Sequence, residues 1–285
     1  MHKRVLSLVL ALLCLAASAA GIPTAAASAA TPQTVAEGIL AWKRTDLGVG
    51  ASEALIGNAL LDLAGTTPGD WYPFGLGRWE IEDNYAGYLA VIRDRVEERY
   101  RQPEKLSAAK ATEWHRIALA VAALGGDPTS CGQDANGDPI NLIADGTYDR
   151  GNTTSLGRQG INGWIWGLIA LDSRRYAVPA GAHDTRDTIL TEILRQQLAD
   201  GGFALSGMVA DPDITAMAVQ ALAPYYNSEQ VYTYAVKGAG ATVSKTVHQV
   251  TEEALACLSA LQLDTGGYES WGTANVESAD QVLVA

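Results

Sequence analysis

The chain has 285 residues, of which 48% are hydrophobic and 18% are charged, a composition typical of a globular protein with a sizeable core. Its 32 acidic and 20 basic residues give a formal net charge of −12 with His neutral. Because nucleic acids and anionic lipids are bound chiefly through Lys and Arg, this charge excludes both as expected partners.

The first 30 residues are typical of an export signal. A basic segment, His2 to Arg4, precedes an apolar run from Val5 to Ala17, and small residues follow up to Thr31. The apolar run is short for a membrane-spanning helix. We therefore expect residues 1–30 to be a signal peptide and residues 31–285 to form a mature domain without an integral membrane segment. This predicts a secreted or cell-surface protein.

Export places Cys131 and Cys257 in an oxidising compartment, where they could form a disulfide. Cys131 lies in a Gly-rich segment, and Cys257 lies within a helical pattern. A buried free thiol is the alternative for both residues. Neither cysteine belongs to a Cys-x-x-Cys pair, so the sequence predicts no metal site and no cofactor.

Two kinds of predicted helix alternate along the chain. Some segments are apolar on nearly every side and must be covered by other parts of the protein. These segments are Ala54 to Gly65, Ile117 to Leu124, Ile161 to Leu171, Ile214 to Ala223 and the run that begins at Ala279. Others, Arg186 to Leu198 and Val247 to Leu261, are amphipathic. The alternation predicts an all-α fold in which exposed helices cover buried ones, an α/α toroid. We expect the toroid to be incomplete at the C-terminus, since an apolar run reaches Ala285.

Two segments depart from the helical pattern. Residues 231–243 alternate like strands around Gly238 and Gly240, which predicts a small β-hairpin. Residues 131–160 form a long polar loop. Its acidic residues partly match a calcium-binding EF-hand loop, but Pro139 stands where that loop needs Gly, so a polar turn or hairpin tip is the preferred interpretation.

One short motif is repeated. Gln197 to Phe203 reads QLADGGF, and Gln262 to Tyr268 reads QLDTGGY. We expect Gly201 and Gly266 to end the preceding helices in left-handed conformation, and the aromatic residue after each to fill the space between layers.

The repeat carries a family resemblance. Ile193, Gln197, Gly201 and Phe203, and again Leu258, Gln262, Gly266 and Tyr268, resemble the QW-type repeat of squalene and terpene cyclases, with Phe or Tyr in place of Trp. The resemblance implies the α/α toroid of the terpenoid cyclase and protein prenyltransferase superfamily, which also includes B12 carriers of the transcobalamin and intrinsic-factor type. Residues 159–173 and 211–226 resemble segments of secreted bacterial surface proteins with this toroid.

Asp211 and Asp213 have two interpretations. Class II terpene cyclases use the central Asp of a D-x-D-D-T-A motif as a proton donor, and Asp211, Asp213, Thr215 and Ala216 match that motif. The resemblance thus makes Asp213 a candidate catalytic acid assisted by Asp211, although Ile214 replaces the last Asp. Alternatively, Asp211 caps a helix and Asp213 lies in its first turn. The start at Ser278 to Asp280 would then be a second helix of this kind.

The zinc site of the prenyltransferases is not expected here. It uses an Asp-x-Cys pair, and neither Cys131 nor Cys257 has Asp two residues before it. His115 is either a ligand contact or a hydrogen-bonded core residue.

Aromatic and polar residues at the ends of the buried segments form a candidate ligand site. The predicted ligand-binding residues are Trp114, His115, Asn162, Trp164, Tyr225 and Trp271. The alternative is that most of them fill the core.

The sequence therefore predicts an exported, non-catalytic module of a cell-surface protein that binds a corrinoid, a glycan or another protein. The alternative is a cyclase-like enzyme that uses Asp213 as a general acid on a polyprenyl, isoprenoid substrate.

Overall fold

The computed structural model describes residues 31–150, 154–238 and 240–285. It is mostly helical, with two small antiparallel hairpins. The predicted signal peptide, residues 1–30, lies outside the described residues. No helix in the described part of the chain is long and apolar enough to cross a membrane.

The first half of the chain contains short and medium-length helices. They are α2 (Pro32–Leu47), α3 (Asn58–Leu61), α4 (Thr67–Trp79), α5 (Tyr85–Tyr100), α6 (Thr112–Ala123) and α7 (Leu142–Gly146). Local signals set the ends of α2: the Thr31 hydroxyl accepts a hydrogen bond from the Thr34 amide, and Gly48 ends the helix at φ 65°.

The second half mixes helices with the hairpins. Its helical elements are η2 (Leu156–Gln159), α8 (Ile161–Ser173), α9 (Arg186–Leu194), α10 (Pro212–Leu222), η3 (Ala223–Tyr225), α11 (Val247–Leu261) and α12 (Val276–Val284). Its strands are β1 (Val231–Ala235), β2 (Thr242–Thr246), β3 (Tyr268–Ser270) and β4 (Thr273–Asn275).

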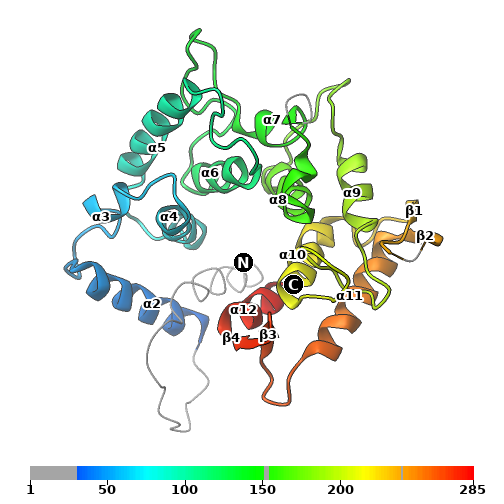
Figure 1. Cartoon of the computed structure of the whole chain (residues 1–285). Helices are drawn as coiled ribbons and strands as arrows, with labels where there is room; N and C mark the ends of the chain where they lie inside the picture. The colour runs from blue at the N-terminus through cyan, green and yellow to red at the C-terminus, as the bar shows by residue number, and fades with distance from the viewer. Residues whose placement is uncertain (1–30, 151–153, 239) are drawn as a thin grey trace.

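Five helices pack in series and lie toward the middle of the molecule in Figure 1. Helix α4 packs on α6, α6 on α8, α8 on α10, and α10 on α12. A second set lies outside them, with α5 on α4, α7 on α6, α9 on α8 and α11 on α10. We refer to the first set as the inner helices. The chain thus alternates between inner and outer positions. The hydrophobic pattern predicts this order from α8 to α11, but it does not identify α4, the first inner helix.

Three inner helices run in the same direction. Residues from the first turns of α4, α6 and α8, namely Thr67, Glu113 and Asn162, line one hollow of about 260 Å³. Residues at the other ends of the same helices, Arg78, Ala123 and Ser173, line a different hollow. The helices are therefore parallel, with their positive dipole ends at one end of the molecule.

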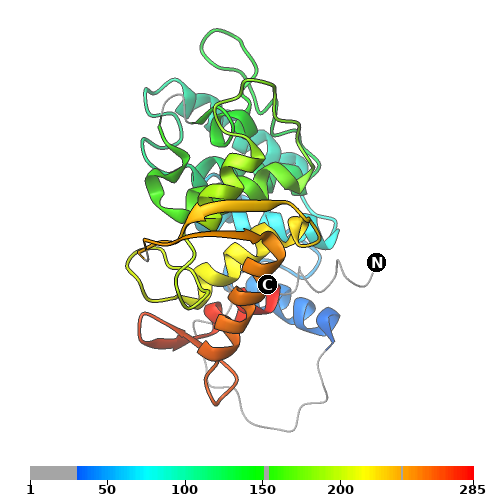
Figure 2. The same ribbon diagram turned by 90° about the vertical axis from the view of Figure 1, so that its right-hand side faces the viewer.

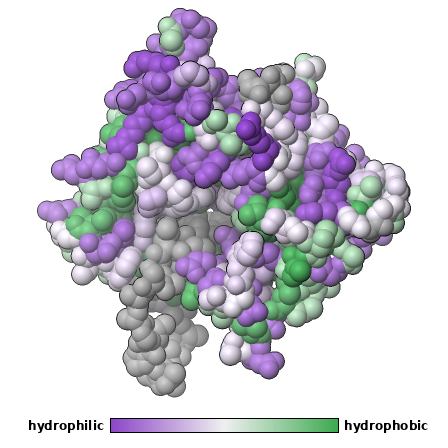
Figure 3. Space-filling view, in the orientation of Figure 1, coloured by the Kyte–Doolittle hydropathy of each residue, from purple (hydrophilic) through white to green (hydrophobic). Residues whose placement is uncertain are grey.

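Most of the core is one cluster that runs from Ile39 to Ala254. Helix α12 departs from the prediction that it would be apolar and covered on every side. Its buried residues are Ser278 and Asp280, whereas Val276 and Leu283 are exposed. Figure 3 shows hydrophobic residues exposed among hydrophilic ones on the face of the molecule that is seen in Figure 1.

The two copies of the repeat share one geometry. Gly201 has φ 86° and Gly266 has φ 82°, which confirms the left-handed prediction. The Gln197 side chain donates to the Gly201 carbonyl at 3.0 Å, and the Gln262 side chain donates to the Gly266 carbonyl at the same distance. Phe203 and Tyr268, which follow these turns, are both buried.

Three predicted helix boundaries need correction. Only α3 is helical within 54–65, because the amides of Leu55 and Ile56 donate to the Asp83 carboxylate and so hold the chain outside a helix. Helix α9 ends at Leu194 and not at Leu198. The last helix is capped by Asn275, whose side chain accepts from the Ser278 amide, so residues 278–280 lie inside α12 and not at its start.

The predicted hairpin is confirmed as β1–β2, with Val231 opposite Thr246, and Figure 2 shows it lying across the outside of the helices. The β3–β4 hairpin was not predicted. In the long loop, the Asp134 carboxylate accepts from the amides of Asn136 and Asp138, which confirms the hairpin-tip interpretation.

Cys131 and Cys257 are both buried and free, which excludes the disulfide between them.

Candidate functional site

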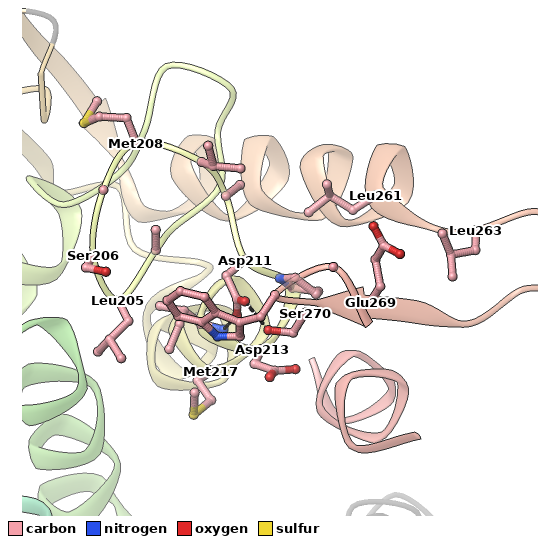
Figure 4. Close-up of a pocket in the computed structure, with 18 residues that line it drawn as sticks. Leu205, Ser206, Met208, Asp211, Asp213, Met217, Leu261, Leu263, Glu269 and Ser270 are labelled. Carbon is pink, nitrogen blue, oxygen red and sulfur yellow. Dashed lines mark hydrogen bonds between the residues drawn. The ribbon is translucent and has the colours of Figure 1, made fainter. Parts of the chain in front are cut away.

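A pocket of about 650 Å³ lies where the two repeats lead into the next inner helices. One wall is the loop Ala204–Ala210, which follows the first repeat, and another is the β3–β4 hairpin, which follows the second. Figure 4 shows Asp211, Asp213 and Ser270 together between these walls, with Leu205 and Met208 on one side and Leu261 and Leu263 on the other. We call this hollow the Asp213 pocket.

Asp211 connects two elements that line the pocket, α10 and β3. One of its carboxylate oxygens accepts from the Ile214 amide at 3.1 Å, which caps α10. The other accepts from the Ser270 hydroxyl and so ties α10 to β3. The helix-capping interpretation of Asp211 is therefore confirmed, and both of its oxygens are engaged.

Asp213 lies in the first turn of α10 and is half-buried. Its Oδ1 atom is buried and accepts no hydrogen bond from any described residue. Burial raises the pKa of Asp213 above its ordinary value of 3.8; the Ser278 hydroxyl opposes the shift, and the charges of Asp211 and Glu277 add to it. The Asp213 carboxyl thus lies between the pocket and the Ser278 hydroxyl of α12.

Trp271 stands at the tip of the β3–β4 hairpin, with 82% of its surface exposed. It has φ 55° and the following Gly272 has φ 75°, so both central residues of this two-residue turn are left-handed. Such turns favour Asn-Gly or Gly-Gly, and a bulky side chain in this conformation is strained. A strained, exposed tryptophan beside a pocket is a feature found at binding sites.

The loop wall is apolar and open to solvent. Leu205, Met208 and Val209 are exposed, with 81% of the Val209 surface accessible. The pocket's carboxylates are Asp211, Asp213 and Glu269, and no Lys, Arg or His is among the described residues that line it. The pocket is therefore apolar at its walls and negative in charge.

Trp114 and His115 lie elsewhere, within the core. The Trp114 indole donates to the Tyr100 hydroxyl at 2.7 Å, and the Arg150 guanidinium lies over its ring at 4.1 Å. His115 Nε2 donates to the Gly146 carbonyl at 2.6 Å, and burial lowers the His115 pKa to about 4. The His115 imidazole is thus neutral at pH 7 and fills a core position.

The other predicted ligand residues are also apart from the Asp213 pocket. Asn162 lines the hollow at the starts of α4, α6 and α8. Trp164 packs against Gly157 so closely that a Cβ atom there would lie 2.3 Å from the indole nitrogen. The Tyr225 hydroxyl donates to Asp172 at 2.7 Å, and Asp172 is also paired with Arg186.

Of the predicted site residues, the fold thus brings together Asp211, Asp213 and Trp271. Sequence reasoning missed Leu205, Met208, Val209, Glu269 and Ser270, which line the same pocket. A signal for the first three was present, because a loop that carries Leu, Met and Val between Gly201 and Asp211 is unusually apolar for a surface connection.

The described residues contain no group of three or more His, Cys, Asp and Glu side chains placed to hold a metal ion. Comparison of the chain with protein-family models gives no match, and comparison with curated proteins gives none either.

Proposed function

We propose that this chain is an exported α/α toroid module of a cell-surface protein that binds a ligand in the Asp213 pocket without changing it chemically. The observation that supports this proposal most directly is Trp271, a strained and largely exposed tryptophan at the edge of an apolar pocket. A volume of about 650 Å³ lies in the range of small-molecule sites. The ligand has an apolar body, which meets Leu205 and Met208, and a polar group that reaches Asp213.

The toroid part of the proposal is supported by the packing of the inner helices in series, each with an outer helix against it. The parallel direction of α4, α6 and α8 agrees with it, as does the shared geometry of the two repeats. Export is supported by the pattern of residues 1–30.

Binding without catalysis is supported by the use of Asp211. In the cyclase interpretation this residue assists the acid, whereas here its two oxygens cap α10 and hold Ser270. Ile214, in place of the last Asp of the motif, is buried.

One experiment tests the proposed site. A neutral, polarity-sensitive dye such as Nile red is titrated into the protein, and its emission should shift to the blue with saturation. The double variant Leu205→Ser/Val209→Ser removes apolar wall, and we expect it to weaken the dye about tenfold. The control is Leu63→Ser, which alters an exposed leucine outside the pocket. Equal dye binding by all three proteins would reject the Asp213 pocket as the site.

A second candidate function, proton donation by Asp213 to an isoprenoid alkene or epoxide, is favoured by the buried Oδ1 atom and the raised pKa of Asp213. Asp213→Asn should then abolish turnover of the isoprenoid with little change in melting temperature. Absence of turnover by the unaltered protein would leave the binding function.

A further inference from the structure

The Asp213 pocket combines apolar walls with one sign of charge. Its carboxylates come from two elements, Asp211 and Asp213 from the start of α10 and Glu269 from β3. The described residues that line it include no cationic side chain. The charge of Glu277 on α12, which is also acidic, acts on Asp213 as well. An anionic ligand would therefore meet repulsion and no counter-charge.

The carboxylates differ in whether their oxygens already accept hydrogen bonds. The two oxygens of Asp211 are already used by Ile214 and Ser270. Asp213 keeps a buried oxygen that accepts no hydrogen bond from a described residue. A positively charged group in the pocket would offset the cost of the partly buried Asp213 charge.

Trp271 provides an aromatic ring that can contact a cation. The face of an indole is the best aromatic partner for a cation, and the attraction is strongest for a cation that sheds its water easily. An inorganic ion would lose part of its hydration shell against Leu205, Met208 and Val209, and the described carboxylates are not grouped to replace that shell. A cation that carries alkyl groups gains from both the ring and the apolar walls.

We infer that the ligand of the Asp213 pocket is a small organic cation with an alkylated ammonium group, held between Trp271 and the Asp213 carboxylate. This inference rests on the proposed function, because it names the chemical class of ligand for the same pocket. The organic-cation inference and the proposed binding function therefore need an experiment in which each can fail separately.

Choline and its uncharged isostere 3,3-dimethyl-1-butanol provide the test, because they differ in the replacement of nitrogen by carbon. Both are titrated by calorimetry at low ionic strength, beside the neutral dye. We expect choline to bind about tenfold more tightly than the isostere, as a desolvated cation–π contact with a nearby carboxylate implies.

Three variants locate the effect. Asp213→Asn should reduce choline affinity about tenfold and leave the isostere unchanged, since a unit charge is removed without loss of volume. Trp271→Leu should weaken choline more than the isostere, because it removes the ring face and retains apolar surface. Glu229→Gln is the control, an exposed carboxylate that does not line the pocket. Thermal melting of each variant checks that it folds.

The outcomes separate the two proposals. Dye binding with equal affinities for choline and the isostere would overturn the organic-cation inference and keep the binding function. Failure of the dye, choline and the isostere together would overturn both. An unchanged choline affinity in Asp213→Asn would remove Asp213 from the site.

Discussion

Among single residues, Trp271 is the clearest case in which local stability and the proposed ligand binding oppose each other. Its backbone is left-handed, and its side chain makes little contact because 82% of its surface is exposed. Replacement by Gly should relieve the strained conformation and raise the free energy of unfolding by about 1 kcal/mol. The same change should weaken ligand binding. Urea unfolding and dye titration of Trp271→Gly check both effects, and a loss of stability would mean that Trp271 serves packing instead.

His115 should give the protein a defined sensitivity to acid. Its pKa is lowered from 6.5 to about 4 by burial, so the folded form holds a neutral imidazole where the unfolded chain holds a charged one. Between pH 4 and pH 6.5 the unfolded chain binds more protons, and stability therefore rises with pH across this window. We expect a loss of about 2 kcal/mol from this residue between pH 7 and pH 4.5.

The measurement is urea unfolding at both pH values for the unaltered protein and for His115→Gln, which keeps a hydrogen-bond donor near the Gly146 carbonyl. The pH dependence should be smaller in the variant by the amount that His115 contributes. An identical pH dependence in the two proteins would assign the acid sensitivity to other groups.

The elements of the fold differ in how far the sequence pattern predicts them. The inner helices α6, α8 and α10 were predicted because burial on every side selects apolar residues throughout. Helix α4 was not, because Pro73 and several glycines obscure its pattern, and α5 is rich in charge. The β3–β4 hairpin consists of two three-residue strands, which are too short for alternation to show.

The repeats allow a matched comparison between elements. Gln197 and Gln262 make the same hydrogen bond within their turns, but Gln197 is buried and also donates to the Val250 carbonyl of α11 at 3.3 Å. Gln197→Leu removes the side-chain donor of the buried Gly201 carbonyl and should cost about 2 kcal/mol. Gln262→Leu is exposed and should change stability by less than about 0.5 kcal/mol. Equal effects on the free energy of unfolding would show that burial does not set the difference.

At the scale of the whole molecule, the buried hydrophobic residues form clusters of very different size. Most buried residues belong to one large cluster, whereas Leu198, Ala204, Ala210 and Cys257 form a small one behind the loop wall of the Asp213 pocket. Cys257 packs so closely on Gly202 that a Cβ atom at Gly202 would lie 2.7 Å from its sulfur. Small clusters beneath loops open more easily than a main core.

We therefore expect Cys257 to react with a thiol reagent faster than Cys131, which belongs to the large cluster. Burial raises the pKa of both thiols to about 11, so the difference should report opening and not acidity. The measurement is mass spectrometry of timed labelling, with the remaining cysteine of the sequence, Cys14, replaced by Ser. A saturating ligand of the Asp213 pocket should slow Cys257 alone, and equal slowing of both cysteines would indicate stabilisation of the entire fold.

Only part of the candidate site could be predicted from the sequence. The motif predicts Asp211 and Asp213, and Trp271 is among the residues predicted to bind a ligand. The other predicted aromatic residues lie in the core or pack against it, as Trp164 and Tyr225 do. A sequence pattern cannot distinguish a buried tryptophan whose indole has a hydrogen-bond partner, such as Trp114, from one that contacts a ligand. That distinction depends on which loops meet in space.

The two walls of the Asp213 pocket come from equivalent positions of successive repeats, the connection after QLADGGF and the connection after QLDTGGY. Duplication of a repeat thus supplies a matched pair of connectors, and each can afterwards change in length and composition by itself. Exchange of one connector reshapes one wall and leaves the helices beneath it in place. Such an architecture can acquire new specificities by recombination of surface loops, and grafting of the Ala204–Ala210 loop is a direct route to engineering one.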